Sequence, residues 1–263
     1  MPAVPDFAAR RFQSAAAHYL GGRAPYPEGL IARTAQILPL GPNDRLMDLG
    51  CGPAQLAAAF APLVGEVLAL DPEPAMLALA REATAHLAKV TVAEGRSDDL
   101  GSRMGRFQAV VIGRAFHWMD RAETLGRLEQ LIEPHGALVL FGDERPDIPD
   151  NAWAKAFEAL IERYSEDDPV RRLRRADSFT PHISVLLASS FNRLERISLI
   201  GRRTLTADSL VQRALSLSST SRARLGDKAD VMIAEIEAFT EAAQADGPLI
   251  EVLTSSALIA RRG

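Results

Sequence analysis

The sequence predicts an α/β fold in which a mostly parallel sheet is covered by helices on both faces. Short apolar runs rich in β-branched residues alternate with helical patterns through the first half of the chain. Strands that alternate with helices at this spacing are typical of βαβ units. A glycine-rich turn follows the first strand, where such folds often place a ligand. With 263 residues, 47% of them apolar, the chain is long enough for one large domain with its own core.

The elements are predicted from apolar runs and helix-start signals. We expect strands at 45–49, 66–70, 90–93, 107–112 and 136–141, and helices at 54–63 and 74–86. Asp120 is expected to cap a further helix, with Glu123 completing a capping box. After residue 141 the pattern changes. Residues 150–190 look helical, a strand is expected at 193–204, helices near 207–217 and 228–245, and a last strand at 249–261.

These elements predict one domain over residues 1–263. The domain would carry an N-terminal helical arm at 1–40 and a helical cap insertion at 146–190.

Composition excludes several kinds of partner. The formal net charge of −4 gives no reason to expect nucleic-acid binding, and no apolar run reaches the ~20 residues of a membrane span. Cys51 is the one cysteine, so we expect neither an internal disulfide nor a metal site. The N-terminal residues show no apolar signal-peptide core, and we predict a cytoplasmic protein.

The turn after the first strand has the features of a cofactor loop. In the sequence RLMDLGCGPAQ of residues 45–55, Gly50 and Gly52 allow a tight turn and a close approach of a ligand to the backbone. The helix that follows offers unpaired N–H groups. Asp71 lies 21 residues after Gly50, at the end of the next strand, where a carboxylate can accept hydrogen bonds from ribose hydroxyls.

Two details of the loop disfavour a dinucleotide. Gln55 replaces the third glycine of the dinucleotide fingerprint, G-x-G-x-x-G. Asp48, immediately before the loop, would repel a pyrophosphate but would attract a cationic amino-acid group. The sequence therefore favours S-adenosylmethionine over a nicotinamide cofactor.

Five segments together resemble the class I S-adenosylmethionine-dependent methyltransferases. The glycine loop DLGCG at 48–52 is similar to their first motif, and LDP at 70–72 with Met76 is similar to the second. GRSDDL at 95–100 resembles the segment that frames the adenine. AFHWMD at 115–120, and the arm residues Tyr19, Arg23, Tyr26 and Pro27, resemble a small-molecule subgroup that includes ubiquinone-biosynthesis-like and trans-aconitate-like enzymes.

The resemblance implies a Rossmann-like sheet of seven strands in the order 3-2-1-4-5-7-6, with the seventh strand antiparallel. It also implies methyl transfer from S-adenosylmethionine to an oxygen, nitrogen or carbon of a small molecule, with S-adenosyl-L-homocysteine as product. Two alternatives stay open: an NAD(P)-dependent oxidoreductase on the same architecture, and a non-catalytic S-adenosylmethionine-binding protein.

The resemblance also assigns expected contacts along the cofactor. Asp48, Gly50 and Gly52 would hold its methionine end, and Asp71 its ribose. Arg23 would reach the carboxylate. The other expected cofactor contacts are Tyr19 over the sulfonium, Pro72, Met76, Ser97 and Asp98 around the adenine, and Cys51, Gln55, Ala115 and Phe116 in the flanking motifs.

Three further features have two interpretations each. His117 follows the fourth strand, and is either a general base or a residue that packs near the cofactor. The arginine cluster at 171–175 (RRLRR) is either an anion site or, as we prefer, a solvated helix face. Serines at 216, 218, 219 and 221 either line a substrate pocket or form a Ser-rich loop.

Overall fold

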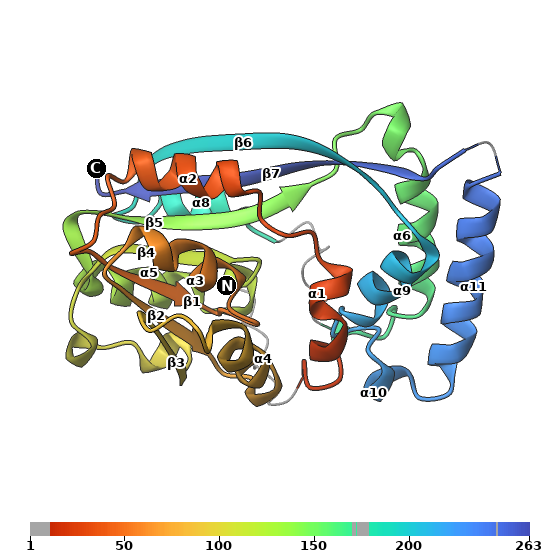
Figure 1. Cartoon of the computed structure of the whole chain (residues 1–263), viewed down its shortest axis with the longest axis horizontal. Helices are drawn as coiled ribbons and strands as arrows, with labels where there is room; N and C mark the ends of the chain where they lie inside the picture. The colour runs from red at the N-terminus through yellow and green to blue at the C-terminus, as the bar shows by residue number, and fades with distance from the viewer. Residues whose placement is uncertain (1–10, 170–171, 173–178, 246) are drawn as a thin grey trace.

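The computed structural model describes residues 11–169, 172, 179–245 and 247–263. A seven-stranded sheet occupies one side of the molecule and a body of helices the other (Figure 1). The sheet order is β3-β2-β1-β4-β5-β7-β6, which confirms the predicted order. The strands are β1 Arg45–Leu49, β2 Glu66–Asp71, β3 Val90–Glu94, β4 Phe107–Gly113, β5 Ile132–Glu144, β6 Arg193–Thr204 and β7 Ile250–Arg261.

The first five strands are parallel, and β7 is antiparallel to both β5 and β6, as predicted. The strand β5 is longer than its apolar run suggested. Gly142, Asp143 and Glu144 continue to pair with Ser256, Ser255 and Thr254 of β7, so the ladder extends past the core. This extension carries β5, β6 and β7 toward the helical body (Figure 1).

Alternate residues of the strands bury two separate cores. One face, with Leu46, Val67 and Val111, packs against α2 Glu28–Ile37, α3 Gln55–Phe60 and α4 Pro74–Thr84. The other face, with Met47 and Val110, packs against α5 Arg121–Leu131 and α8 His182–Leu187. A parallel sheet covered on both faces in this way explains the near-continuous apolar runs in its strands.

The start of α5 differs from the predicted capping box. Asp120 Oδ1 accepts a hydrogen bond from Glu123 N at 3.0 Å, so the cap itself is present. Among the described hydrogen bonds, the Glu123 carboxylate accepts from Arg127 and makes no return bond to Asp120 N. The Glu123 carboxylate forms an i, i+4 ion pair with Arg127 in place of the second hydrogen bond of the capping box.

The helical body has an apolar cluster of its own. Its helices are α6 Trp153–Arg163, α9 Ala207–Leu215, α10 Arg222–Leu225 and α11 Lys228–Ala243. The body therefore includes chain between β6 and β7 as well as α6 of the expected 146–190 segment, while α8 of that segment packs under the sheet through Leu186.

The arm joins the helical body through α1 Tyr19–Gly22. His18 Nδ1 lies 2.7 Å from Gln212 Oε1 of α9, and a side chain at Gly22 would collide with the backbone of Gln212 at 2.5 Å. Glycine at position 22 thus allows α1 and α9 to pack closely. No described helix is both long and apolar enough to cross a membrane.

Candidate active site

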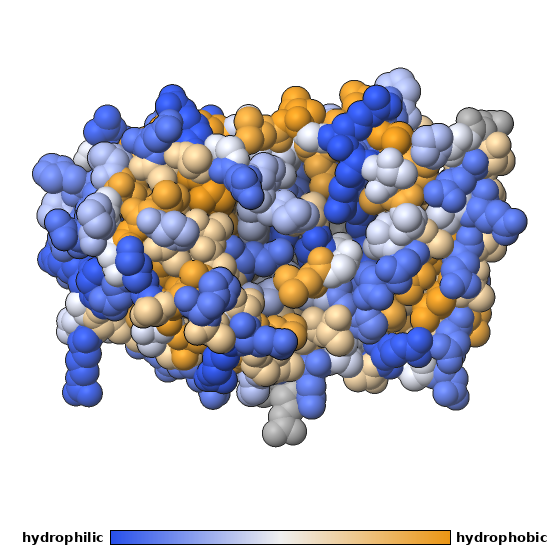
Figure 2. Space-filling model, viewed as in Figure 1, coloured by the Kyte–Doolittle hydropathy of each residue, from blue (hydrophilic) through white to orange (hydrophobic). Residues whose placement is uncertain are grey.

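A cavity of about 750 Å³ lies between the sheet and the helical body. It begins at the carboxyl ends of β1, β2 and β4, where open α/β sheets place their ligands. The surface is hollowed between the two parts of the molecule (Figure 2). Of the sequence-predicted residues, the structure brings the following to this cavity: Tyr19, Arg23, Gly50, Gly52, Asp71, Pro72, Met76, Ser97, Ala115, Phe116 and His117.

The glycine loop forms a tight cradle at one end of the cavity. Gly50 and Gly52 have φ of +70° and +54°, in the left-handed region that favours glycine. The N–H groups of Gly50 and Cys51 both donate to the carbonyl of Leu70, at 2.8 and 2.9 Å. A Cβ on Gly50 would lie 2.6 Å from the Cβ of Ala115, so the loop passes close to the turn after β4.

Asp71 lies at the mouth of this cradle. Its Oδ2 accepts from Gly52 N at 2.8 Å and its Oδ1 from Glu73 N at 2.9 Å. Burial raises the pKa of Asp71 to about 6, although the two backbone hydrogen bonds oppose that rise. The carboxylate is thus fixed in orientation and lines the cavity with lone pairs still free to accept.

Asp48 lies behind the loop, away from the main cavity. Its Oδ2 accepts from Ala57 N at 2.9 Å, which satisfies an N–H in the first turn of α3. Asp48, Cys51 and Gln55 line a separate void of about 10 Å³. Burial, with Asp71 nearby, raises the pKa of Asp48 to about 7. Burial also raises the pKa of the Cys51 thiol, so Cys51 fills the turn as a small neutral side chain.

Replacing Asp48 by asparagine is expected to stabilise the ligand-free protein at pH values above the pKa of Asp48. The native pKa of Asp48 lies above its ordinary value, so native stability falls as pH rises from about 4 to 7. An asparagine Oδ1 still accepts from Ala57 N without that cost. Urea denaturation should show Asp48→Asn more stable than the wild type at pH 8 by on the order of 2 kcal/mol, and by less at pH 5. An equal difference at both pH values would contradict the burial argument.

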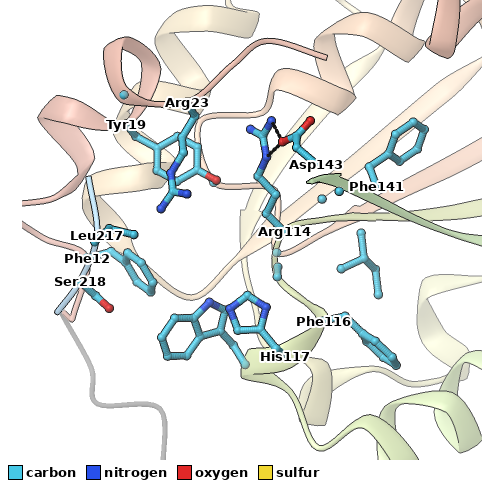
Figure 3. Close-up of a pocket in the computed structure, with 18 of the residues that line it drawn as sticks. Phe12, Tyr19, Arg23, Arg114, Phe116, His117, Phe141, Asp143, Leu217 and Ser218 are labelled. Carbon is cyan, nitrogen blue, oxygen red and sulfur yellow. Dashed lines mark hydrogen bonds and ion pairs between the residues drawn. The ribbon is translucent and has the colours of Figure 1, made fainter. Parts of the chain in front are cut away.

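The arm and the turn after β4 place two arginines beside the cradle (Figure 3). Arg23 lies over the ring of Tyr19, 5.6 Å from its centroid, and its buried Nε has no hydrogen-bond partner among the described residues. Arg114 has φ of +56° and pairs with Asp143. It also donates to the carbonyl of Ala24 and lies 4.4 Å from the ring of Tyr26. Arg114 and Asp143 belong to no motif that the sequence offered.

The structure places three of the four expected adenine contacts at the cavity and leaves the fourth outside its lining. Pro72, Met76 and Ser97 line the cavity. Asp98 does not line it. Its half-exposed carboxylate pairs with Arg96 Nε at 2.9 Å instead. Desolvation is the largest single effect on the pKa of Asp98 and raises it, but the hydrogen bond from Arg96, a backbone hydrogen bond and nearby arginines together lower the pKa.

His117 sits in a cluster of rings on the cavity floor. Its ring is tilted against Trp118, with centroids 4.9 Å apart, and stacks on His182 of α8 at 6.5 Å. Phe12 of the arm meets Trp118 edge-on at 5.3 Å. Figure 3 shows His117 pointing into the cavity below Arg114. His117 is therefore placed for either of its two interpretations.

The far end of the cavity is lined by residues that no motif indicated. They come from β5, α6, β6, α9 and the segment after α9, and include Arg145, Phe157, Arg203, Arg213, Leu217, Ser218 and Ser219. Ser218 and Ser219 thus belong to the cavity wall. Within the arginine cluster at 171–175, residues 171 and 173–175 lie outside the described residues. Arg172 is largely exposed, with Nη2 3.4 Å from Asp167 Oδ1.

The known proteins that this chain resembles are consistently methyltransferases. Residues 46–136 match a family model described as a methyltransferase domain. An uncharacterized methyltransferase of Mycobacterium tuberculosis is 29% identical over 170 residues, which are 64% of this chain and 65% of that protein. A probable S-adenosylmethionine-dependent methyltransferase of Saccharomyces cerevisiae is 26% identical over 145 residues, 54% of this chain and 49% of that protein. The chain thus spans just under two thirds of the length of the curated relatives it matches first, and about half of the yeast protein.

Solved structures share the fold over almost the whole chain. Methyltransferases from Thiobacillus denitrificans and Geobacter sulfurreducens, both in complex with S-adenosyl-L-homocysteine, superpose with TM-scores of 0.57 and 0.56. Each covers 97% of this chain and 99% of its own, at 14% identity, so the likeness is one of fold. Residues 46–136 therefore form a methyltransferase domain, and the curated relatives and solved structures that the chain resembles are methyltransferases with the same sheet.

Proposed function

We propose that the chain transfers a methyl group from S-adenosylmethionine to a small-molecule acceptor bound in the same cavity. One observation carries this proposal: the glycine cradle with Asp71 opens into a cavity that continues past His117 to walls made by the helical body. Cofactor and acceptor would thus meet in one cavity. The volume of about 750 Å³ is within the ~300–1,000 Å³ of small-molecule sites.

The residues at the cradle fit the cofactor. Gly50 and Gly52 line the cavity with left-handed backbone and no side chain, which leaves their backbone open to the close approach of a ligand. Asp71 offers a fixed carboxylate to two ribose hydroxyls, and the unpartnered Nε of Arg23 offers a donor to the cofactor carboxylate. Pro72, Met76 and Ser97 supply the adenine side, with Gly52 and Tyr19 along the methionine.

Some of the expected contact residues are proposed to act from behind the loop or from the wall of the cavity, and not by lining the cofactor. Asp48 would attract the cofactor ammonium from behind the loop, and Cys51 and Gln55 shape the turn without lining the main cavity. Ala115 and Phe116 form the wall that the loop packs against, while Asp98 stays with Arg96 at the rim.

When bound, the cofactor supplies a methyl group on a positively charged sulfur, which leaves as a neutral thioether. The protein has to align the acceptor with that methyl group and to keep water out. Proximity and alignment alone supply as much as ~7–11 kcal/mol in favourable reactions. The aromatic rings of Phe12, Tyr19 and Trp118 line the cavity and would limit the access of water to the methyl group.

We infer that the N-terminal arm (1–40) and the helical insertion (146–190) cover the site. The described part of the arm spans both halves of the molecule: Phe12 N donates to Glu73 Oε2 at 3.2 Å, and Arg11 forms an ion pair with Asp168. A cover held at both ends is suited to admitting the acceptor and then closing over it. The arm and segment 115–120 also resemble the small-molecule subgroup, which supports a small acceptor.

His117 is proposed to face the transferred methyl group, with packing as its main contribution. We expect His117→Phe to keep kcat within about tenfold, because it keeps the ring stack with Trp118 and His182. His117→Ala should lose more, since it opens the cavity floor. A general base would contribute ~10²–10⁴-fold to kcat. If His117→Phe lost kcat by that factor and also lost the acidic limb of the pH–rate profile, His117 would be assigned as the general base.

The proposed function is tested with methyl-labelled S-adenosylmethionine and a broad panel of small metabolites. We expect label to appear in at least one small molecule, together with S-adenosyl-L-homocysteine. A duplex DNA and a structured RNA are the comparison substrates. Labelling of a nucleic acid and of no small molecule would contradict the proposal.

A further inference from the structure

Three arginines at the far end of the cavity converge on one carboxylate. Glu251 of β7 is fully buried. Its Oε1 accepts from Arg145 Nε at 2.7 Å, and its Oε2 from Arg203 Nε at 2.7 Å and from Arg213 Nη2 at 2.8 Å. Arg145, Arg203 and Arg213 all line the cavity, whereas Glu251 lies behind them.

This cluster carries an excess of positive charge. Although burial opposes it, the guanidinium groups of Arg213 and Arg145 lower the pKa of Glu251 to about 2, so Glu251 is ionised. Glu158 is the second carboxylate in contact, 3.4 Å from Arg145 Nη1, and its side chain is half exposed. Three cations therefore contact two anions, so the direct ion pairs of the cluster leave one positive charge, although Glu144 next to Arg145 also lines the cavity.

Arg213 is held rigidly with one donor unused. Its guanidinium lies 5.8 Å from the ring centroid of Trp153, whose Nε1 is itself fixed by the carbonyl of Ile250 at 2.8 Å. Arg213 is only 7% exposed, yet its buried Nη1 has no hydrogen-bond partner among the described residues. A buried donor that is left without a hydrogen bond costs ~1–3 kcal/mol of stability, and a charged donor costs more. A ligand acceptor atom at Nη1 would recover that cost.

The cluster is separate from the Arg114–Asp143 pair beside the cradle. Arg114 pairs with Asp143, and Asp143 Oδ1 accepts from Ser255 Oγ on β7 at 2.8 Å. Glu251 lies four residues before Ser255 on the same strand, a distance of about 13 Å at ~3.3 Å per residue. One cavity thus has a second cationic region, which extends along β7 from the Arg114–Asp143 pair to Glu251.

Apolar side chains also line the wall around Arg213. Phe157 and Ile161 of α6, Leu217 and Leu253 line the cavity together with Arg213, and Ser218 adds a hydroxyl. Figure 3 shows Leu217 and Ser218 on the side of the cavity opposite the Arg114–Asp143 pair. A ligand that fits this end has an apolar part and a compact anionic group.

We propose that the methyl acceptor carries a carboxylate, and that Arg213 binds it with Arg145 and Arg203 supplying the surrounding positive charge. With Nη2 on Glu251, Arg213 offers Nη1 for a charge-assisted hydrogen bond to a carboxylate oxygen. The proposal rests on the proposed function, because it concerns the acceptor half of the same cavity.

The test uses probes rather than the acceptor itself. 4-Phenylbutanoate and its neutral amide, 4-phenylbutanamide, are titrated into the protein saturated with S-adenosyl-L-homocysteine, with binding followed by NMR. We expect the carboxylate to bind at least about tenfold more tightly than the amide, the effect of one charge-assisted pair. Arg213→Gln should abolish this preference, and Arg213→Lys should keep only part of it.

Arg202→Gln is the matched control. Arg202 is next to Arg203 on β6, but it is exposed, pairs with Asp150 and does not line the cavity. We expect it to keep the full preference. Equal binding of the two probes, no binding of either, or a preference retained in both Arg213 variants would overturn the proposal. Binding of S-adenosyl-L-homocysteine is measured first in every variant; its absence in the wild type would refute the proposed function instead.

Discussion

Replacing Asp71 by alanine is expected to lower the affinity for S-adenosyl-L-homocysteine by about 100-fold. Two hydrogen bonds from ribose hydroxyls to a fixed carboxylate are each worth ~1.5–3 kcal/mol, part of which water recovers in the variant. The substitution also frees Gly52 N, so the loop loses an anchor. Isothermal titration calorimetry measures the change directly.

Asp98→Ala is the matched control for Asp71→Ala. Both residues are acidic and both were expected at the cofactor, but Asp98 is half exposed, pairs with Arg96 and does not line the cavity. We expect less than a threefold change for Asp98→Ala, since exposed ion pairs contribute only ~0–1 kcal/mol. A larger loss in Asp98→Ala than in Asp71→Ala would reverse the assignment of the two carboxylates.

The pH dependence of binding follows from the same carboxylate. Because burial raises the pKa of Asp71 to about 6, its ionised form is lost as pH falls below that value. A protonated Asp71 has one acceptor oxygen fewer for the ribose. Affinity for S-adenosyl-L-homocysteine should therefore fall from pH 7.5 to pH 5 in the wild type, and less steeply in Asp71→Asn.

Gly50→Ala is expected to abolish cofactor binding and to destabilise the protein. An alanine at φ +70° costs ~1–2 kcal/mol, and its Cβ would lie 2.6 Å from the Cβ of Ala115, a contact that forces the loop to move. Overpacking of this kind typically adds ~1–3 kcal/mol. Urea denaturation and calorimetry with S-adenosyl-L-homocysteine measure the two effects.

Two glycine variants separate these causes. Gly52→Ala shares the left-handed backbone, at φ +54°, but its Cβ would meet nothing nearer than Met76 Sδ at 3.9 Å, so it should be less destabilised than Gly50→Ala. Gly126→Ala in α5 has open space around the new Cβ and should be stabilised by about 0.5–1 kcal/mol. If Gly50→Ala and Gly52→Ala proved equally stable, the close approach of Gly50 to Ala115 would not contribute to the stability loss.

Local patterns were sufficient to predict much of the sheet and one end of the site. The strands β1 and β6 have the predicted bounds, because each is delimited in the sequence by turn residues and charge. The glycine loop and Asp71 were predictable for a similar reason. A loop between consecutive elements, and a residue at the end of the next strand, are brought together by a single βαβ unit.

The acceptor end was not predictable in this way. Arg145 directly follows β5, Arg203 is on β6 and Arg213 is on α9, and the long β5–β7–β6 extension brings them to Glu251. In the sequence each is one more arginine beside exposed-looking polar residues. The prominent cluster at 171–175 drew attention as a candidate anion site, yet its one described arginine, Arg172, is largely exposed.

The central claim is that this cavity binds S-adenosylmethionine through the Gly50–Gly52 cradle. Calorimetric titration of the wild-type chain with S-adenosyl-L-homocysteine and, separately, with NADH tests it most directly. The account predicts saturable one-site binding of S-adenosyl-L-homocysteine, lost in Gly50→Ala and retained in Gly126→Ala, with no binding of NADH. Binding of NADH without binding of S-adenosyl-L-homocysteine would contradict it.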